Sequence, residues 1–282
     1  MENSGTMRDS IERTPENIKL HTEEDFEGMR KSGRLAAETL DMIGEYVKPG
    51  VTTDALNTLV HDFILDHGAV PAPLDYKGFP KSCCISINEV VCHGIPGKRV
   101  LKERDILNID VTCILDGWHG DTSRMYTAGE PKKFAKRLID VTHETLMRGL
   151  ATIKEGTTFG ELGRAMQDYA QGEKCSVVRE FCGHGLGQSF HEEPNILHYE
   201  AARGEQHYNL QQTKMRAGMF FTVEPMVNLG KRHTKVKNDG WTAVTKDGLL
   251  SAQFEHTLAV TKEGCEIFTL SPAGKFHPDG AA

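Results

Sequence analysis

The sequence contains no apolar run long enough to cross a membrane, and its mean hydropathy is -0.42. The first twenty residues are polar and charged, so we expect no secretory segment. The net charge of -7 disfavours a nucleic-acid-binding protein. The densest basic stretch, residues 231–237, is typical of a solvated hairpin. We therefore expect neither a membrane nor a specific nucleic acid as partner.

Cysteines suitable for a structural framework are also lacking. The seven cysteines are an odd number and include no CxxC pair, which disfavours both a disulfide framework and a cysteine-based zinc site. This usage is typical of a reducing compartment. The cytoplasm is the predicted location.

Several common catalytic motifs are absent. The sequence has no HExxH zinc motif, no GxSxG nucleophile motif and no phosphate-binding P-loop or GxGxxG loop. Cys92 beside His93 raises the alternative of a thiolate nucleophile, although no third group that would orient such a pair is evident.

Length and patterning favour one folded unit. A chain of 282 residues is compatible with a single domain containing helices and strands. Residues 1–17 and 271–282 are rich in charged residues, Pro and Gly and are predicted to be mobile tails. Residues 18–270 are predicted to form a single catalytic domain.

Helical and strand patterns alternate along this domain. Thr22 and Asp25 have the spacing of a capping box, and the helix that follows is predicted to continue to Pro49. The remaining predicted helices cover about residues 54–66, 132–154 and 159–171. Strands are predicted at residues 84–87, 90–92 and 106–115, with a hairpin turn at 116–117. The fold class is therefore α+β.

The second half of the domain resembles the first. A Lys-to-Leu spacing of eight occurs at 48–56 and again at 154–162. After each of the two helices come a His-Gly pair, an apolar strand ending in an acid, an Asp-Gly turn and a second acid. In the first half these residues are His93, Asp110 and Asp121, and in the second half they are His184, Glu224 and Glu255. Four matches in the same order predict two related halves around a shared sheet, with a site between them.

This repeat would bring four carboxylates and two histidines together. Oxygen-rich clusters with an imidazole suit divalent ions such as Mn, Fe, Co or Zn, and carboxylates can bridge two such ions. An acid after an apolar strand is costly to bury unpaired, and a metal would supply the missing charge. Taken singly, each acid is more often a strand cap or a solvated group. The repeat favours the metal site.

At this point the sequence closely resembles a known family, the type I methionine aminopeptidases. The resemblance covers about residues 18–270 and is carried by ordered motifs in both halves. These motifs lie at residues 79–82, 86–96, 108–112, 116–123, 183–194, 221–225 and 253–257. It implies the pita-bread fold, in which two pseudo-symmetric halves surround a curved, mainly antiparallel sheet.

The resemblance also implies roles for individual residues. Two divalent ions would activate a water molecule, with Asp121 and Glu255 bridging them. Glu224 would carry the proton of the water, His191 would stabilise the developing oxyanion, and His93 would hydrogen-bond the scissile amide nitrogen. The implied metal ligands are Asp110, Asp121, His184, Glu224 and Glu255.

A small apolar pocket is implied for the methionine side chain. The matching positions are Tyr76, Phe79, Cys84, Phe190 and Trp241. Two departures from the family pattern occur. Pro73 stands where many members have a cysteine, and residues 200–213 lengthen the segment between His191 and Glu224, which is interpreted as a surface loop.

The implied function is removal of the initiator methionine from nascent proteins and peptides with a small second residue. The short interval between Glu224 and Glu255 leaves no room for the insert of type II enzymes. Expected partners are peptide and nascent-chain N-termini, with transient ribosome contact, and the expected state is a monomer. The alternatives are an X-Pro aminopeptidase of the same fold, a non-catalytic binding protein and a single-metal structural site.

Overall fold

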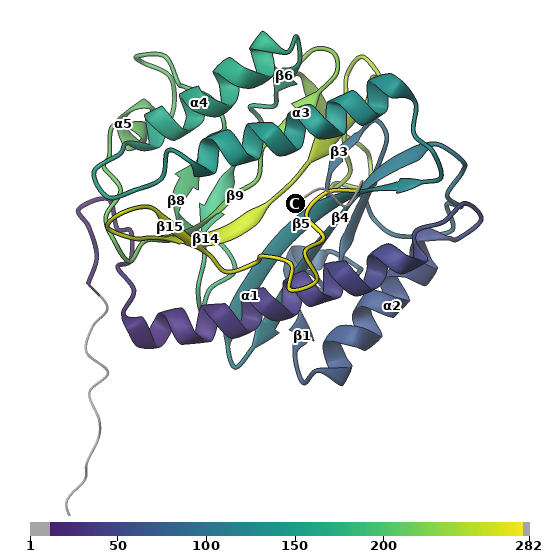
Figure 1. The fold of residues 1–282 in the computed structure, drawn as a ribbon, viewed down its shortest axis with the longest axis horizontal. Helices are drawn as coiled ribbons and strands as arrows, with labels where there is room; N and C mark the ends of the chain where they lie inside the picture. The colour runs from purple at the N-terminus through teal and green to yellow at the C-terminus, as the bar shows by residue number, and fades with distance from the viewer. Residues whose placement is uncertain (1–11, 279–282) are drawn as a thin grey trace, which may run out of the picture.

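The computed structural model describes residues 12–278. Two helices, α1 (Glu23–Ile43) and α2 (Thr53–Asp66), lie on one side of the strands, and α3 (Lys133–Leu150) and α4 (Phe159–Gly172) lie on the other (Figure 1). Helix α1 packs on β4 and β5, whereas α3 packs on β9, β10 and β13. Each half of the chain therefore supplies one helix pair and its own strands.

The strands form four small sheets, and every described strand pair is antiparallel. In the first half, the sheet order is β1-β4-β2, with β5 paired to β4; the largest sheet of the second half has the order β15-β14-β9-β7-β8. Two three-stranded sheets, β13-β10-β6 and β11-β12-β3, complete the set. The strands are β1 Val70–Pro71, β2 Cys84–Ile87, β3 Val90–Cys92, β4 Asp105–Leu115, β5 Trp118–Ala128, β6 Ser176–Val177, β7 Gly183–Gly185, β8 Glu192–Ile196, β9 Phe220–Val223, β10 Met226–Asn228, β11 Thr234–Val236, β12 Ala243–Thr245, β13 Ser251–Gln253, β14 His256–Val260 and β15 Cys265–Ile267. The α+β class and the two-halved pita-bread architecture are confirmed.

Local sequence signals account for several element boundaries. The main-chain nitrogen of Thr22 donates to Asp25 Oδ2 over 2.8 Å, as the predicted capping box requires. Asp116 and Gly117 have φ angles of 51° and 83° and turn β4 into β5. The ends of two helices were predicted too far along the chain. Helix α1 ends at Ile43 and is followed by a 3-10 turn, Gly44–Tyr46, while α3 ends at Leu150.

Asp110 lies inside strand β4, which covers Asp105–Leu115 in agreement with the strand predicted at 106–115, and not at a strand end as the repeat pattern described it. Strand β4 continues through it to Leu115, because its hairpin partner β5 pairs with it along the whole length. Residue 110 lies opposite Cys84 on β2 and Ser123 on β5. Its position in the interior of the sheet holds the carboxylate more firmly than a strand end would. Glu224, by contrast, directly follows β9, as predicted.

The segment predicted to be a surface loop, residues 200–213, is partly ordered into the fold. It contains helix α5 (Tyr208–Gln211), and the side chain of Gln211 is buried. That side chain donates to Tyr199 O over 2.7 Å and accepts from the main-chain nitrogen of Ala201 over 2.6 Å. The polar composition of the segment did not indicate this contact. Gln211 can be buried because its amide side chain satisfies two main-chain groups.

The predicted tails lie partly outside the described residues, which exclude 1–11 and 279–282. In the described part, Arg13 forms a β-bridge with Lys19, and the side chain of Thr14 is buried. At the other end, Ser271 Oγ donates to both carboxylate oxygens of Asp41 over 2.8 Å. Both predicted tails therefore include buried residues, Thr14 and Ser271, and the mobility of the outermost residues remains a prediction.

Each half has its own hydrophobic core. The larger core lies between α3, α4 and the second-half strands and includes Phe159, Leu162 and Phe221. The other lies between α1, α2 and the first-half strands and includes Leu40, Leu56 and Ile109. Among the described residues, none of the helices has the length and apolarity needed to span a bilayer. The interval between the two cores contains the polar site.

Candidate metal centre and active site

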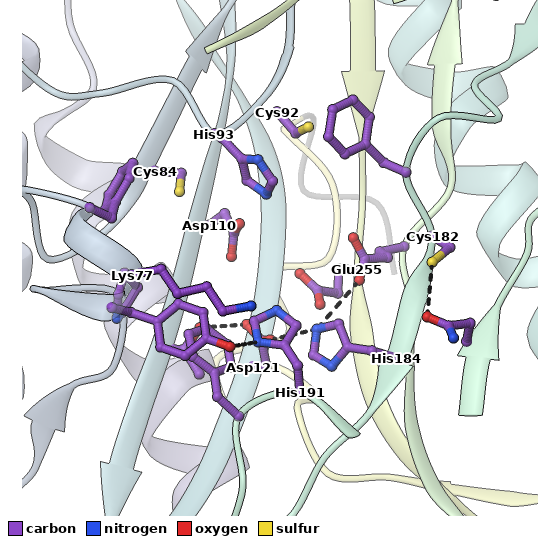
Figure 2. Close-up of a pocket in the computed structure, with 18 of the residues that line it drawn as sticks. Lys77, Cys84, Cys92, His93, Asp110, Asp121, Cys182, His184, His191 and Glu255 are labelled. Carbon is purple, nitrogen blue, oxygen red and sulfur yellow. Dashed lines mark hydrogen bonds and ion pairs between the residues drawn. The ribbon is translucent and has the colours of Figure 1, made fainter. Parts of the chain in front are cut away.

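A cavity of about 710 Å³ opens at the seam of the two halves. All residues that the sequence analysis assigned to a site line it, and Figure 2 shows acids and histidines from both halves pointing into it. These residues are Pro73, Tyr76, Phe79, Cys84, His93, Asp110, Asp121, His184, Phe190, His191, Glu224, Trp241 and Glu255. The volume of this cavity falls within the range of about 300–1,000 Å³ typical of ligand sites.

Asp121, His184 and Glu255 form the tightest group in the cavity. One possible ligand atom from each lies within 4.8 Å of the others, and all three residues are buried. His184 Nε2 lies 3.5 Å from Asp121 Oδ2 and 3.8 Å from Glu224 Oε1. Asp110 also lines the cavity, outside this tight group.

Near the two His-Gly pairs, neighbouring segments of main chain approach each other closely. This close approach brings the acids and histidines together. A Cβ atom on Gly185 would lie 2.2 Å from Glu193 O, and one on Gly94 would lie 2.2 Å from Ile85 O. Only glycine fits at such distances. Each His-Gly pair of the sequence repeat therefore places its histidine where the chain crosses a neighbouring strand.

Burial changes the electrostatics of the carboxylates. It raises the pKa of Asp110 and Glu255 well above their ordinary values, and the neighbouring carboxylates raise both further. Burial likewise raises the pKa of Glu224, to about 7. The pKa of His184 is also raised, because its hydrogen bond to Asp121 and the charge of Glu224 outweigh burial, which acts in the opposite direction.

These shifts test whether the site fits divalent cations. Of the described residues that line the cavity, Lys77 is the only lysine or arginine, which leaves four clustered carboxylates with little positive charge around them. Carboxylates with one imidazole are donors that Mn, Fe, Co and Zn accept. The donor set and its unbalanced negative charge therefore fit a divalent metal centre.

Hydroxyl and amide side chains hold the acids in place. Thr112 Oγ1 donates to Asp121 Oδ1 over 2.7 Å. Thr222 Oγ1 donates to Glu224 Oε1 over 2.9 Å, and Gln253 Nε2 donates to Glu224 Oε2 over 3.2 Å. Such partners fix the direction of a ligand before any ion binds.

His198 is a further supporting residue that the sequence analysis missed. Its side chain is completely buried, and its Nε2 accepts a hydrogen bond of 3.1 Å from the main-chain nitrogen of Glu224. Burial lowers the pKa of His198 to about 3, which keeps the ring neutral and able to accept. No local motif marks this histidine; only its position beside Glu224 does.

The two histidines assigned to catalysis differ in their surroundings. His191 Nδ1 lies 2.9 Å from the hydroxyl of Tyr76, and partial burial together with His184 lowers the pKa of His191. Burial and His184 also lower the pKa of His93, whose ring packs edge-on against Trp241 and Phe181. Both rings are therefore neutral near pH 7.

Four aromatic side chains, Tyr76, Phe79, Phe190 and Trp241, form an aromatic wall of the cavity beside its histidines. Phe79 packs edge-on against Trp241 with ring centres 5.2 Å apart, and Tyr76 packs against Phe190 at 4.8 Å. Cys84 and Phe79 are buried. Pro73 lines the same cavity, so this departure from the family pattern affects its wall. The wall suits an apolar, flexible side chain.

Comparison with known proteins identifies the class of the chain. Residues 27–262 match the model of metallopeptidase family M24. The chain belongs to this family.

Individual relatives narrow the assignment. The chain is 56% identical over 262 residues to the methionine aminopeptidase of Rickettsia prowazekii, covering 93% of this chain and 98% of that protein. It is 52% identical over 255 residues to the methionine aminopeptidase of Escherichia coli K12, covering 90% and 94%. The crystal structure of the Rickettsia prowazekii enzyme superposes with a TM-score of 0.85, covering 90% of this chain and all of that chain. Within the family, the similarity is to methionine aminopeptidases, which confirms the resemblance inferred from the motifs.

A more distant neighbour shares only the fold. The Xaa-Pro dipeptidase of Bacillus anthracis has a TM-score of 0.71 at 22% identity, and the match covers 62% of that longer chain. This level of identity supports a common architecture and carries no argument about substrate.

Proposed function

We propose that this metallopeptidase removes the N-terminal methionine from nascent proteins and peptides whose second residue is small. The observation that carries the proposal is the meeting of four carboxylates and His184 in a cavity with an aromatic wall. The identity of more than half of the aligned residues to a curated methionine aminopeptidase supports the choice of substrate.

We further propose that the site holds two divalent ions, each Fe, Mn, Co or Zn. The residues that would hold them are Asp110, Asp121, His184, Glu224 and Glu255. When bound, such ions lower the pKa of a water molecule and polarise the scissile carbonyl. The raised pKa values of Asp110 and Glu255 support this, because cations would offset the repulsion among these acids.

Three residues would move or hold protons. Glu224 would take a proton from the attacking water and return it later in the reaction. If the Tyr76 hydroxyl donates to His191 Nδ1, the neutral ring carries its proton on Nε2 and can donate to the developing oxyanion. His93 would hydrogen-bond the scissile amide nitrogen.

The aromatic wall would bind the methionine side chain. Tyr76, Phe79, Phe190 and Trp241 offer ring faces and edges, and Cys84 offers a sulfur. A thioether makes favourable contacts with aromatic rings and adapts to irregular space. Selection would therefore depend on shape and polarizability rather than charge.

We also propose where this enzyme acts and which molecules it meets. All seven cysteines are free, and most are buried, which supports a reducing compartment and hence the cytoplasm. The substrates would be the N-termini of peptides and nascent chains, met during transient contact with the ribosome. The enzyme would act as a monomer.

The substrate assignment is tested by comparing Met-Ala-Ser with Ala-Pro peptides. We expect turnover of the first, and turnover of the second alone would contradict the assignment. Metal analysis of protein purified without oxygen addresses ion number and identity. One ion per chain at full activity would contradict the two-metal site.

A further inference from the structure

The N-terminal hairpin, residues 13–19, lies before the region matched by the family model, which begins at residue 27. It is nevertheless attached to the body of the protein. Ile18 is buried in the second-half core, and the main-chain nitrogen of His21 donates to Gly218 O over 2.8 Å. Thr14, also buried, closes the hairpin by donating from its main-chain nitrogen to Ile18 O.

A mostly buried ion pair fixes the hairpin against the active site. Lys19 Nζ lies 2.5 Å from Glu192 Oε2, and the two side chains are only 13% and 16% exposed. Glu192 begins β8 directly after His191 and lines the cavity. An ion pair this far removed from water resists separation more than a surface pair. The hairpin therefore keeps a fixed position beside His191.

Asn17, at the tip of this hairpin, lines the same cavity as the metal ligands. Its backbone has a φ of 66°, a left-handed conformation that asparagine tolerates well. Arg13 Nη1 donates to both its main-chain oxygen and its Oδ1, over 2.8 and 3.2 Å. Among the described residues, no hydrogen bond uses the Nδ2 group of Asn17, and the residue is exposed.

The placement of Asn17 indicates what it would contact. Asp121, Glu255 and Phe79 are buried in the cavity, whereas Asn17 is exposed at its edge. A peptide whose first residue lies against the wall, with its first peptide bond at His191, continues outward past the start of β8. An amide donor suits the carbonyl oxygens of a peptide main chain without selecting a sequence.

We propose that the N-terminal hairpin forms an outer binding site in which Asn17 donates a hydrogen bond to the main chain of the substrate, on the carboxyl side of its third residue. This inference rests on the proposed aminopeptidase function. The site would make long peptides better substrates than short ones that begin with the same residues.

The test compares Met-Ala-Ser with an eight-residue peptide that begins with the same three residues. Asn17→Asp keeps the size of the side chain and the acceptor for Arg13 but replaces the Nδ2 donor with an oxygen. Asn17→Gly removes the side chain and keeps the left-handed backbone without strain. We expect both to lower kcat/KM for the long peptide by about two- to tenfold, mainly through KM, the effect of one hydrogen bond.

Turnover of Met-Ala-Ser should stay unchanged in both variants. The control is Asn209→Ala, which removes an exposed asparagine from α5, outside the cavity, and should leave the preference for the longer peptide intact. An unchanged preference in Asn17→Asp would overturn the proposal, as would equal losses on both peptides. Failure of the proposed function is distinguishable, because the unmodified enzyme would then cleave neither peptide.

Discussion

The hydroxyl of Thr257 donates a hydrogen bond of 2.6 Å to the main-chain oxygen of Asp121, across the seam between the two halves. A reciprocal bond of 2.7 Å runs from Thr122 Oγ1 to the main-chain oxygen of Glu255. The backbones of Asp121 and Glu255, two of the residues that would hold the metals, are therefore tied to each other's neighbouring residues. We expect this exchange of hydrogen bonds to restrict the separation of the two acids.

Thr257→Val tests the importance of these two reciprocal hydrogen bonds. The substitution keeps the side-chain shape but leaves the Asp121 carbonyl without the Thr257 donor. We expect the free energy of unfolding to fall by about 1–3 kcal/mol, the cost of an unsatisfied buried polar group, and the affinity for Mn²⁺ to fall as well. Chemical denaturation and calorimetric titration of metal-free protein measure the two quantities.

Thr142→Val is the matched control for that substitution. Thr142 is equally buried, but its hydroxyl donates to Leu138 O within helix α3, so its loss should leave metal affinity unchanged. Equal metal affinities for Thr257→Val and the unmodified protein would refute a role of the seam in setting the site.

Glu224→Gln tests the proposed proton carrier. The amide oxygen can still accept from Thr222, but it cannot take a proton from water at neutral pH. We expect kcat for Met-Ala-Ser to fall by at least about a hundredfold, the typical worth of general acid-base catalysis, while circular dichroism shows an unchanged fold. Glu144→Gln, an acid on the outer helix α3, should retain full activity. Unchanged kcat in Glu224→Gln would remove Glu224 from the mechanism.

The third prediction concerns His198. Two substitutions can separate the effect of its hydrogen-bond acceptor from the effect of its size. His198→Gln can place an oxygen near the position of Nε2, whereas His198→Leu fills the space without an acceptor. We expect the leucine variant to lose about 10- to 100-fold in metal affinity or kcat, as partners of metal ligands commonly do, and the glutamine variant to recover most of this loss.

The control for His198 is His61→Leu. His61 pairs with Ser82 beside another cavity, so its loss should affect neither quantity. If the glutamine and leucine variants of His198 lose activity equally, the hydrogen bond to Glu224 does not matter and packing alone accounts for the residue.

The fourth prediction concerns stability at low pH. His21 is buried and stacked on Phe220 with ring centres 4.0 Å apart, and burial lowers its pKa below 6.5, against the opposing charge of Asp25. The unfolded chain therefore binds a proton more readily than the folded protein, so stability is present above about pH 6.5 and is lost as the pH falls toward the folded-state pKa.

Replacing His21 with Phe should reduce this loss of stability. We expect the difference in urea midpoint between pH 7.5 and pH 5.5 to be smaller in His21→Phe than in the unmodified protein. Equal differences in the two proteins would show that His21 does not carry the acid sensitivity.

Local chemistry made much of the fold predictable. A capping box needs only residues three apart, as with Thr22 and Asp25, and the turn at Asp116 and Gly117 needs only two residues. Helix ends were less predictable, since α1 passes at Ile43 into the 3-10 turn Gly44–Tyr46 instead of continuing toward Pro49. At Gly44 a Cβ atom would lie 2.9 Å from the ring of Tyr126, a residue far along the chain.

The sequence by itself determined the chemistry of the site. The ordered repeat and the family motifs named four clustered carboxylates and three histidines that line the cavity, because residue type and order are written in the chain. Tertiary structure alone decided how they are held: His198 meets Glu224, Thr257 meets Asp121 and Lys19 meets Glu192. These contacts join residues separated by 26 to 173 positions, and a hydrogen bond has no sequence signature when only folding brings its donor and acceptor together.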